Sequence, residues 1–159
     1  MRFVRAFSSA VALAAIITVA APGSAAPPPD PALAALPAKM VAALTTNDAT
    51  ALRAACAPTS TVVDEFAPYS WSGADTCVRW SAAFKTFMRQ VKMSDPKGTV
   101  APHPFIDVTG NHAYVVAKVK FVAMMSGKPV SEEGTWAFVL AKSGAAWKIT
   151  SLAWGTLHH

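Results

Sequence analysis

The order of the predicted elements constrains this chain more than any other feature. Two short helical segments come first, followed by one strand, one long amphipathic helix and about four strands that run to the end. A strongly bent antiparallel sheet wrapped round one long and two shorter helices forms a cone with an open mouth, so we expect an α+β domain of this architecture. Side chains alternate along the first strand, Thr61–Phe66, so Val62, Asp64 and Phe66 share one face. Asp64 is therefore predicted to point into the cone.

The N-terminal residues have the pattern of a secretory signal peptide. Met1–Arg5 carries two positive charges, Ala6–Ala21 has no ionisable group, and small residues lead to a predicted cleavage after Ala25. The mature protein is therefore expected to be exported, to the periplasm or outside the cell. The leader's apolar run is short for a membrane span and charges interrupt every later apolar run, so we expect no span in the mature chain. The predicted divisions are a signal peptide at 1–25, a proline-rich spacer at 26–32 and a single domain at 33–159.

The charge balance argues against nucleic acid as a partner. Removal of Arg2 and Arg5 with the leader lowers the formal net charge from +5 to about +3. The sequence also lacks a dense block of lysine and arginine. A charge of this size favours solubility and indicates little else.

Cys56 and Cys77 are the two cysteines of the chain, and both belong to the predicted mature part. Export leads to an oxidising compartment, so a Cys56–Cys77 disulfide is expected, with a stabilisation of about 3 kcal/mol on the chain-entropy model. Two free buried thiols are the alternative. Two cysteines alone make a poor metal site, and no neighbouring residue suggests a catalytic thiolate.

Helical spacing and helix-breaking residues define the N-terminal part of the domain. Four apolar residues recur at helical spacing: Leu33, Leu36, Met40 and Leu44. Pro37 interrupts this pattern, so the regular helix is predicted to start there, with the proline in its first turn. Asp48 is predicted to cap a second short helix that runs through Ala55, and residues 58–60 are predicted to end it.

A capping box predicts where the long helix begins. Ser72 is followed three residues later by Asp75, the pattern that opens many helices. The apolar stripe of this helix consists of Cys77, Trp80, Phe84, Phe87, Met88 and Val91. Residues 95–98 are predicted to end it, and the preceding residues 67–71 are predicted to form an aromatic loop.

The C-terminal half alternates between apolar and polar residues as strands do. The predicted strands are 100–108, His112–Met125, Glu133–Ala141 and Ala146–Gly155. Pro102 and Pro104 place part of the first of these at a sheet edge or a bulge. In the last strand the apolar residues change from one set of alternate positions to the other between Ile149 and Leu152, which predicts a bulge near Ser151.

Three segments carry a family resemblance through their order and spacing: Thr61-Val62-Val63-Asp64-Glu65-Phe66, Ser72-Gly73 and Gly144-Ala145-Ala146-Trp147-Lys148-Ile149. With them the chain, from about Leu33 to its end, resembles a nuclear transport factor 2-like domain of the SnoaL-like kind, in a secreted bacterial form. The resemblance implies a cone in which helices plug a bent sheet. Ketosteroid isomerase, scytalone dehydratase, limonene epoxide hydrolase and polyketide cyclases share this fold with proteins that only bind or assemble, so the fold alone does not choose a function.

Asp64 is the leading catalytic candidate. Desolvation on an apolar strand face should raise its pKa toward a value useful for a general base. The resemblance implies the same role, because the base of ketosteroid isomerase lies on the corresponding strand. That enzyme also needs a tyrosine from its first helix, which the matching residues 39–41 lack, and a protonated acid that the sequence does not identify. Steroid-type isomerisation is therefore not expected, and the structural alternative is that Asp64 bonds a backbone amide, Tyr69 or Trp71.

Two further ionisable residues have weaker claims to a role. Glu65 follows on the opposite strand face and is expected to be solvated or paired with a lysine. His103 lies between two prolines and could act as an acid or base at the cone mouth, or be an exposed edge histidine. No histidine, aspartate and glutamate cluster has metal-ligand spacing, so neither a metal nor a cofactor is expected.

Large aromatic residues are numerous for a domain of this size. Five of them are candidates for ligand binding: Tyr69, Trp71, Trp80, Trp136 and Trp154. Tyr69 and Trp71 could rim a pocket for an apolar ligand, or pack within their loop. For Trp80 and Trp136, packing in the core is the simpler interpretation.

Three functional classes remain open at this point. The first is an exported domain that binds a small, largely apolar molecule in its cone. The second is an isomerase, dehydratase or cyclase that transfers a proton with Asp64, assisted by Tyr69 or His103. The third is an interaction module that forms a homodimer or docks a partner through the outer sheet face around Tyr114, Val116 and Val122.

Overall fold

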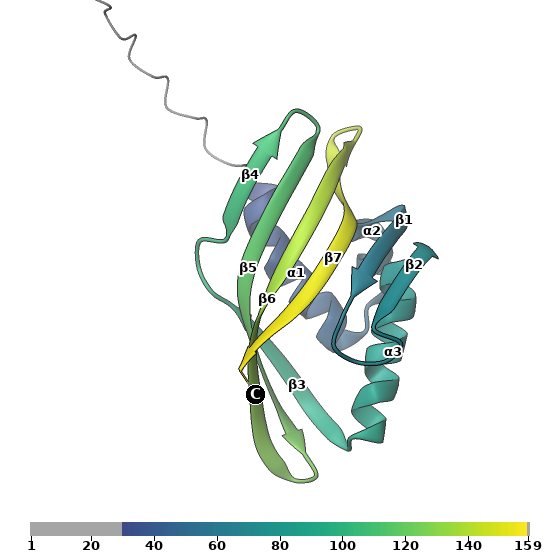
Figure 1. Cartoon of the computed structure of the whole chain (residues 1–159), viewed down its shortest axis with the longest axis vertical. Helices are drawn as coiled ribbons and strands as arrows, with labels where there is room; N and C mark the ends of the chain where they lie inside the picture. The colour runs from purple at the N-terminus through teal and green to yellow at the C-terminus, as the bar shows by residue number, and fades with distance from the viewer. Residues whose placement is uncertain (1–29, 159) are drawn as a thin grey trace, which may run out of the picture.

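The computed structural model describes residues 30–158 of the chain, so the predicted signal peptide and most of the predicted spacer lie outside the described residues. The described residues form three helices and seven strands (Figure 1). In chain order these are α1 (Pro31–Thr46), α2 (Ala49–Ala55), β1 (Cys56–Val63), β2 (Ser70–Ala74), α3 (Thr76–Gln90), β3 (Met93–Val100), β4 (Phe105–Thr109), β5 (His112–Met125), β6 (Lys128–Ser143) and β7 (Ala146–His158).

The strands form a single curved sheet with the helices on one of its faces (Figure 1). The strand order is β2-β1-β7-β6-β5-β3, and the short strand β4 pairs with the other end of β5. The predicted α+β cone is thereby confirmed. One pair, β1 with β7, is parallel, whereas every other pair is antiparallel. The alternation of residues along a strand does not encode the direction of its neighbour, so this pair could not be anticipated.

Helix α1 begins earlier than predicted. Asp30 caps it, since its side chain accepts a hydrogen bond of 2.9 Å from the backbone N–H of Ala32. Pro31 occupies the first turn, where a missing N–H costs little, and Pro37 is buried inside the helix instead of starting it. The last two residues of the predicted spacer are therefore helical. The cap of α2 by Asp48 is confirmed, with hydrogen bonds of 3.0 and 2.9 Å from two backbone amides.

The segment between α2 and α3 differs from the prediction in two ways. Residues 58–60, predicted to end a helix, lie inside β1, and β1 itself ends at Val63, so Asp64 opens the loop that follows. The predicted capping box is wrong, because Ser72 lies in a strand, β2, that the sequence did not indicate. Asp75 is the left-handed residue before α3 and its side chain makes no capping hydrogen bond.

The outer strands show how bulges absorb residues that break the pattern. Residues 95–98, which were predicted to end the long helix, lie inside β3. The register of β3 against β5 shifts between Ser94 and Lys97. The predicted strand over 100–108 is divided between β3 and β4. The bulge expected near Ser151 is confirmed, because Ser151 pairs with Val139 while Ile149 pairs with Leu140.

The core lies between the concave sheet face and the helices. Its largest fully buried side chains come from all of these layers: Trp80, Trp136, Phe138, Leu33, Met40, Leu52, Leu140, Ile149 and Leu152. A disulfide joins Cys56 at the end of α2 to Cys77 in the first turn of α3, as predicted. Within the described part of the chain, no helix is long and apolar enough to cross a membrane.

Candidate functional site

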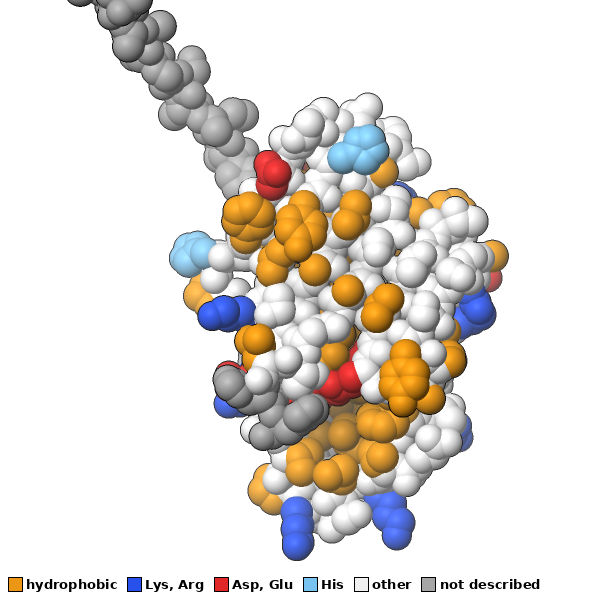
Figure 2. Space-filling view, in the orientation of Figure 1, with side chains coloured by type: hydrophobic (Ala, Val, Ile, Leu, Met, Phe, Trp, Pro, Cys, Tyr) orange, Lys and Arg blue, Asp and Glu red, His pale blue; other side chains and the backbone are white. Residues whose placement is uncertain are grey.

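The sheet and helices enclose a cavity of about 720 Å³ that opens to the surface. Figure 2 shows a hollow lined by hydrophobic side chains, with acidic side chains at one edge. Most of the lining residues are apolar, and they come from α1, the loop after β1, α3, β3, β5, β6 and β7. The cone is therefore not packed solid, in contrast to an ordinary protein interior.

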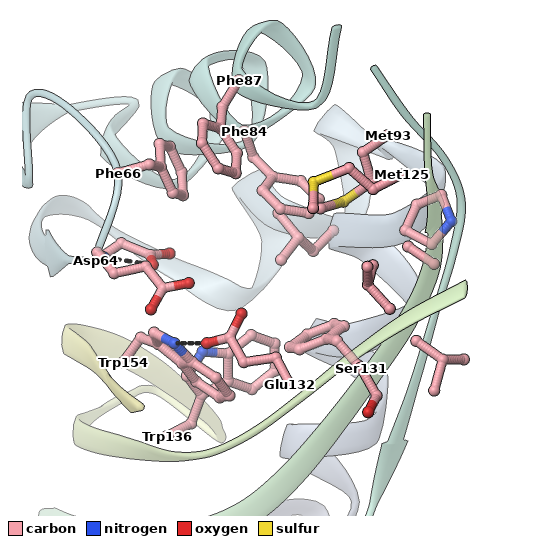
Figure 3. Close-up of a pocket in the computed structure, with 17 residues that line it drawn as sticks. Asp64, Phe66, Phe84, Phe87, Met93, Met125, Ser131, Glu132, Trp136 and Trp154 are labelled. Atoms are coloured by element: carbon pink, nitrogen blue, oxygen red, sulfur yellow. Dashed lines mark hydrogen bonds between the residues drawn. The ribbon is translucent and has the colours of Figure 1, made fainter. Parts of the chain in front are cut away.

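Aromatic and thioether side chains form most of the cavity wall. Figure 3 shows Phe66, Phe84 and Phe87 along one side, and Met93 and Met125 at one end. The rings of Phe66 and Phe87 are stacked, with centroids 5.2 Å apart. Trp136 and Trp154 form the opposite side and pack edge to face at 6.2 Å (Figure 3). Such a wall offers dispersion contacts and ring faces to a ligand.

Asp64 lies at the acidic end of this cavity, beside the aromatic wall (Figure 3). Its Oδ2 accepts a 2.7 Å hydrogen bond from Nε1 of Trp80, and its Oδ1 accepts a 2.7 Å bond from the backbone N–H of Glu65. Its backbone N–H donates to the carbonyl of Tyr69 and so closes the loop between β1 and β2. The carboxylate thus bonds a backbone amide, as the structural alternative required, but its indole partner is Trp80.

Burial raises the pKa of Asp64 from the usual 3.8 to about 6. The hydrogen bonds from Trp80 and the backbone of Glu65 oppose this shift, and the nearby charge of Glu65 adds to it. Removal from water disfavours the charged form of a carboxyl group, which explains why burial dominates. Asp64 is therefore positioned to exchange a proton near neutral pH.

Glu65 and Glu132 lie at the same end of the cavity as Asp64. Thr156 donates its hydroxyl to Oε2 of Glu65, and Oε1 of Glu132 accepts a 3.0 Å bond from Nε1 of Trp154. Burial, reinforced by a hydrogen bond and a repulsive charge from Glu65, raises the pKa of Glu132. The protonated form of Glu132 is therefore favoured more than that of a glutamate in water.

Glu65 is exposed, as expected of a solvated side chain, but it also lies at the cavity, which the sequence did not indicate. Because β1 ends at Val63, strand alternation no longer applies to Glu65, which lines the cavity with Asp64. Glu132 was not identified from the sequence. It lies on β6 two residues before Gly134, in a stretch where polar and apolar residues do not alternate regularly. The sequence therefore held no pattern that assigned Glu132 to the inner face of the sheet.

The structure distributes the predicted ligand-binding aromatics between the cavity and other places. Trp136 and Trp154 line the cavity, and Trp80 is buried behind Asp64. Trp71 is buried in the core cluster and Tyr69 is 62% exposed; neither lines the cavity. Tyr69 therefore stays in the loop before β2, and Trp71 belongs to strand β2.

His103 does not line the cavity. It is exposed and lies between β3 and β4 with a backbone φ of 58°. In the described residues no group of three or more histidine, cysteine, aspartate or glutamate side chains is placed to hold a metal ion.

The outer sheet face carries a smaller apolar patch. Phe105 and Tyr114 pack edge to face at 6.4 Å, and Tyr114 pairs with Val139 on the neighbouring strand. All three side chains are at least 42% exposed. Val122, predicted to belong to this patch, is 40% exposed and also lines the cavity.

Comparison with known proteins places this geometry in a known fold. No family model and no curated protein sequence matches the chain. A nuclear transport factor 2-like superfamily protein from Salmonella enterica is 15% identical, with 80% of this chain and 89% of that chain covered and a TM-score of 0.66. A candidate dehydratase of the same family from Streptomyces avermitilis is 14% identical, with 80% and 95% covered and a TM-score of 0.66. A type 2 hexachlorocyclohexane dehydrochlorinase (LinA) is 7% identical, with 80% and 84% covered and a TM-score of 0.69.

These similarities confirm that the chain has the nuclear transport factor 2-like fold. At such low identity they show the fold and leave the activity open, because the same fold carries different chemistries.

Proposed function

We propose that this protein binds a small, largely apolar molecule inside its cone. The observation that carries the proposal is the cavity of about 720 Å³, with its wall of phenylalanine, methionine and tryptophan side chains. Ligand pockets of proteins typically measure about 300–1,000 Å³ and combine an apolar wall with a few polar groups. The two solved neighbours named as a dehydratase and a hexachlorocyclohexane dehydrochlorinase support a small-molecule role, since both names denote chemistry on small molecules.

Filling the cavity tests this proposal. Ala123 lines the cavity on β5, and Ala123→Trp should occupy part of it. The neutral apolar dye N-phenyl-1-naphthylamine should bind the natural protein with an increase in fluorescence, and the variant should bind at least tenfold more weakly. Ala82→Trp, on the exposed side of α3, is the matched control and should leave binding unchanged. Equal dye binding by the two variants would refute binding in the cone.

A second function, proton transfer at the bound molecule, is favoured by the carboxyl groups at one end of the cavity. Asp64 has a pKa of about 6 and can act as a base near neutral pH. The raised pKa of Glu132 favours its protonated form, and this side chain is the neighbouring acid that the sequence did not identify. In this proposal Glu132, in place of His103 or Tyr69, assists Asp64.

Isotope exchange tests proton transfer without knowledge of the substrate. The probe is 2-tetralone, an apolar ketone with acidic C–H bonds beside its carbonyl. In D₂O the protein should accelerate the uptake of deuterium by this ketone, measured by mass spectrometry. Asp64→Asn should abolish the acceleration, and Asp107→Asn, which removes an exposed carboxylate on β4, should not. A protein that binds the ketone without accelerating exchange would be a binding protein only.

The interaction-module hypothesis has less support. It predicted a filled cone, whereas the cone holds a cavity. The exposed Phe105, Tyr114 and Val139 still offer a face on which two copies could associate. Sedimentation of the natural protein and of Tyr114→Lys, compared at several concentrations, tests whether a dimer forms through this face.

Export to an oxidising compartment is part of the proposal. The support is the Cys56–Cys77 disulfide, a bond that persists in secreted and periplasmic proteins and is rare in the cytosol. The predicted leader agrees with it. Mass spectrometry of the protein recovered from its native host should find the mature chain starting at residue 26 and both cysteines oxidised.

A further inference from the structure

The ionisable groups of the cavity all belong to one chemical type. Its ionisable lining residues in the described part of the chain are Asp64, Glu65 and Glu132; no lysine, arginine or histidine is among them. Ser131 is the remaining hydroxyl on the wall. An anionic ligand would therefore meet like charge and no cation, whereas a cation would meet several carboxyl groups.

From this arrangement we propose that the occupant of the cavity is an apolar molecule that carries an organic ammonium group, with the cation at the Asp64, Glu65 and Glu132 end and the apolar part among Phe84, Phe87 and Met125. The inference rests on the proposed binding function and adds the chemical class of the ligand.

The carboxylate of Asp64 retains acceptor capacity for such a cation. A carboxylate offers about four lone-pair sites, and Asp64 uses one on each oxygen, for Trp80 and for the backbone of Glu65. The remaining sites are available to an N–H donor that enters the cavity. On Glu132, the bond from Trp154 reaches Oε1, and the Thr156 hydroxyl also lies 3.0 Å from that oxygen, so both contacts are on one side of the carboxyl group.

Desolvation explains why a cation suits this end better than a neutral polar group. A ligand that fills the cavity removes water from carboxyl groups that are already partly buried, and this penalises their charged forms. An ammonium group offsets the penalty through charge-assisted hydrogen bonds, which are about twice as strong as neutral ones. A neutral ligand brings no such compensation.

The aromatic wall adds a second attraction for a cation. Trp154 and Trp136 stand beside the carboxyl groups, and Phe66 follows Asp64 by two residues (Figure 3). An organic cation close to a ring face is attracted by the electron density of the ring, most strongly by tryptophan. Carboxylates and ring faces thus act on the same part of the ligand.

A series of three ligands that share a ten-carbon alkyl chain and differ in the head group tests the inference. Decylamine, decanol and decanoate, each below its concentration of self-association, are titrated into the natural protein at pH 7.5 by calorimetry. Decylamine should bind at least tenfold more tightly than decanol, and decanoate should bind most weakly. If decanol binds as tightly as decylamine, the ammonium inference is overturned while binding in the cone stands. If none of the three binds and the dye does not bind either, the proposed function itself fails.

Variants separate the carboxyl end from a general surface charge effect. Asp64→Asn and Glu132→Gln should each reduce the preference for decylamine over decanol by about tenfold. Glu133→Gln is the matched control, since Glu133 neighbours Glu132 but pairs with Lys120 on the exposed side of the sheet. Retention of the full preference in both cavity variants, or its equal loss in Glu133→Gln, would overturn the inference. Circular dichroism identifies any variant that fails to fold.

The pH dependence in the natural protein supplies a second readout that needs no variant. Asp64 lies beside Glu65 and the Trp80 indole and lines the same cavity as Glu132, and its pKa of about 6 means that most of it is protonated at pH 5. Decylamine stays cationic across this range, so its affinity should rise about tenfold between pH 5 and pH 8. The affinity of decanol should not rise. A decylamine affinity that is flat or falls over this interval would contradict the inference.

Discussion

The indole Nε1–H of Trp80 donates a 2.7 Å hydrogen bond to Oδ2 of Asp64. Trp80 lies in the second turn of α3 and is only 1% exposed, whereas Asp64 opens the loop after β1. The bond therefore joins the long helix to the acidic end of the cavity. It also orients the carboxylate, because a tryptophan fixed in the core cannot follow a moving side chain.

Trp80→Phe should raise the pKa of Asp64 above 6 and lower the stability of the fold. The indole bond favours the charged carboxylate, so its loss leaves burial less opposed. The free energy of unfolding should fall by about 2 kcal/mol, through the lost bond to a charged group and the smaller ring. Titration of the carboxyl carbon by NMR and urea unfolding measure the two effects.

Trp147→Phe is the matched control for this substitution. Trp147 donates a 2.9 Å bond to Asp30, so its loss removes an indole–carboxylate bond at another place in the fold. The pKa of Asp64 should be the same in Trp147→Phe as in the natural protein. An equal shift in both variants would mean that the indole bond to Asp64 has no specific effect.

The contribution of Asp64 to the stability of the protein should fall as the pH rises from about 4 to about 6. Asp64 has a higher pKa in the folded than in the unfolded chain, so folding takes up a proton in this interval and stability is lost as that proton leaves. Asp64→Asn cannot ionise. Relative to the natural protein, it should gain up to about 3 kcal/mol in the free energy of unfolding between pH 4 and pH 8. Urea unfolding at both pH values measures this difference, and parallel pH profiles would refute it.

The disulfide should contribute substantially to stability. It closes a loop with a sequence separation of 21 and joins the end of α2 to α3. Replacement of Cys56 and Cys77 by serine should lower the free energy of unfolding by about 3 kcal/mol, mainly because the unfolded chain regains conformational freedom. Urea titration of the natural protein with a reducing agent should reproduce the value. A variant as stable as the oxidised protein would contradict the prediction.

Gly134→Ala should disturb the acidic end of the cavity from the sheet side. A Cβ at Gly134 would lie 2.2 Å from the Trp154 ring, so the indole that bonds Glu132 would have to move. We expect a loss of about 2 kcal/mol, typical of overpacking, and a change in the fluorescence of Trp154. Gly155→Ala is the control, since its Cβ would meet nothing nearer than 4.0 Å. Similar unfolding curves for both variants would count against the steric argument.

Periodicity predicted the parts of the fold that depend on which face a residue occupies. Along β5, Val115, Ala117 and Val119 are buried while Lys118 and Lys120 are exposed, as alternation required. The bulge near Ser151 followed from a slip in the same pattern. The loop between β1 and β2 was less predictable, because alternation fails as soon as a chain leaves the strand. The place of the exposed Glu65 at the cavity was missed for that reason.

The amino-acid sequence alone determined the order of the elements, the buried face of each central strand, the disulfide partners and the presence of an acid beside an apolar face. These depend on neighbours along the chain or on composition. The tertiary structure decided the rest: the parallel pairing of β1 with β7, the cavity, and the meeting of Glu65 with Glu132 from a loop and a strand far apart in the sequence. Long-range packing creates these contacts, and packing depends on the whole set of side chains that fill, or leave unfilled, the space between sheet and helices.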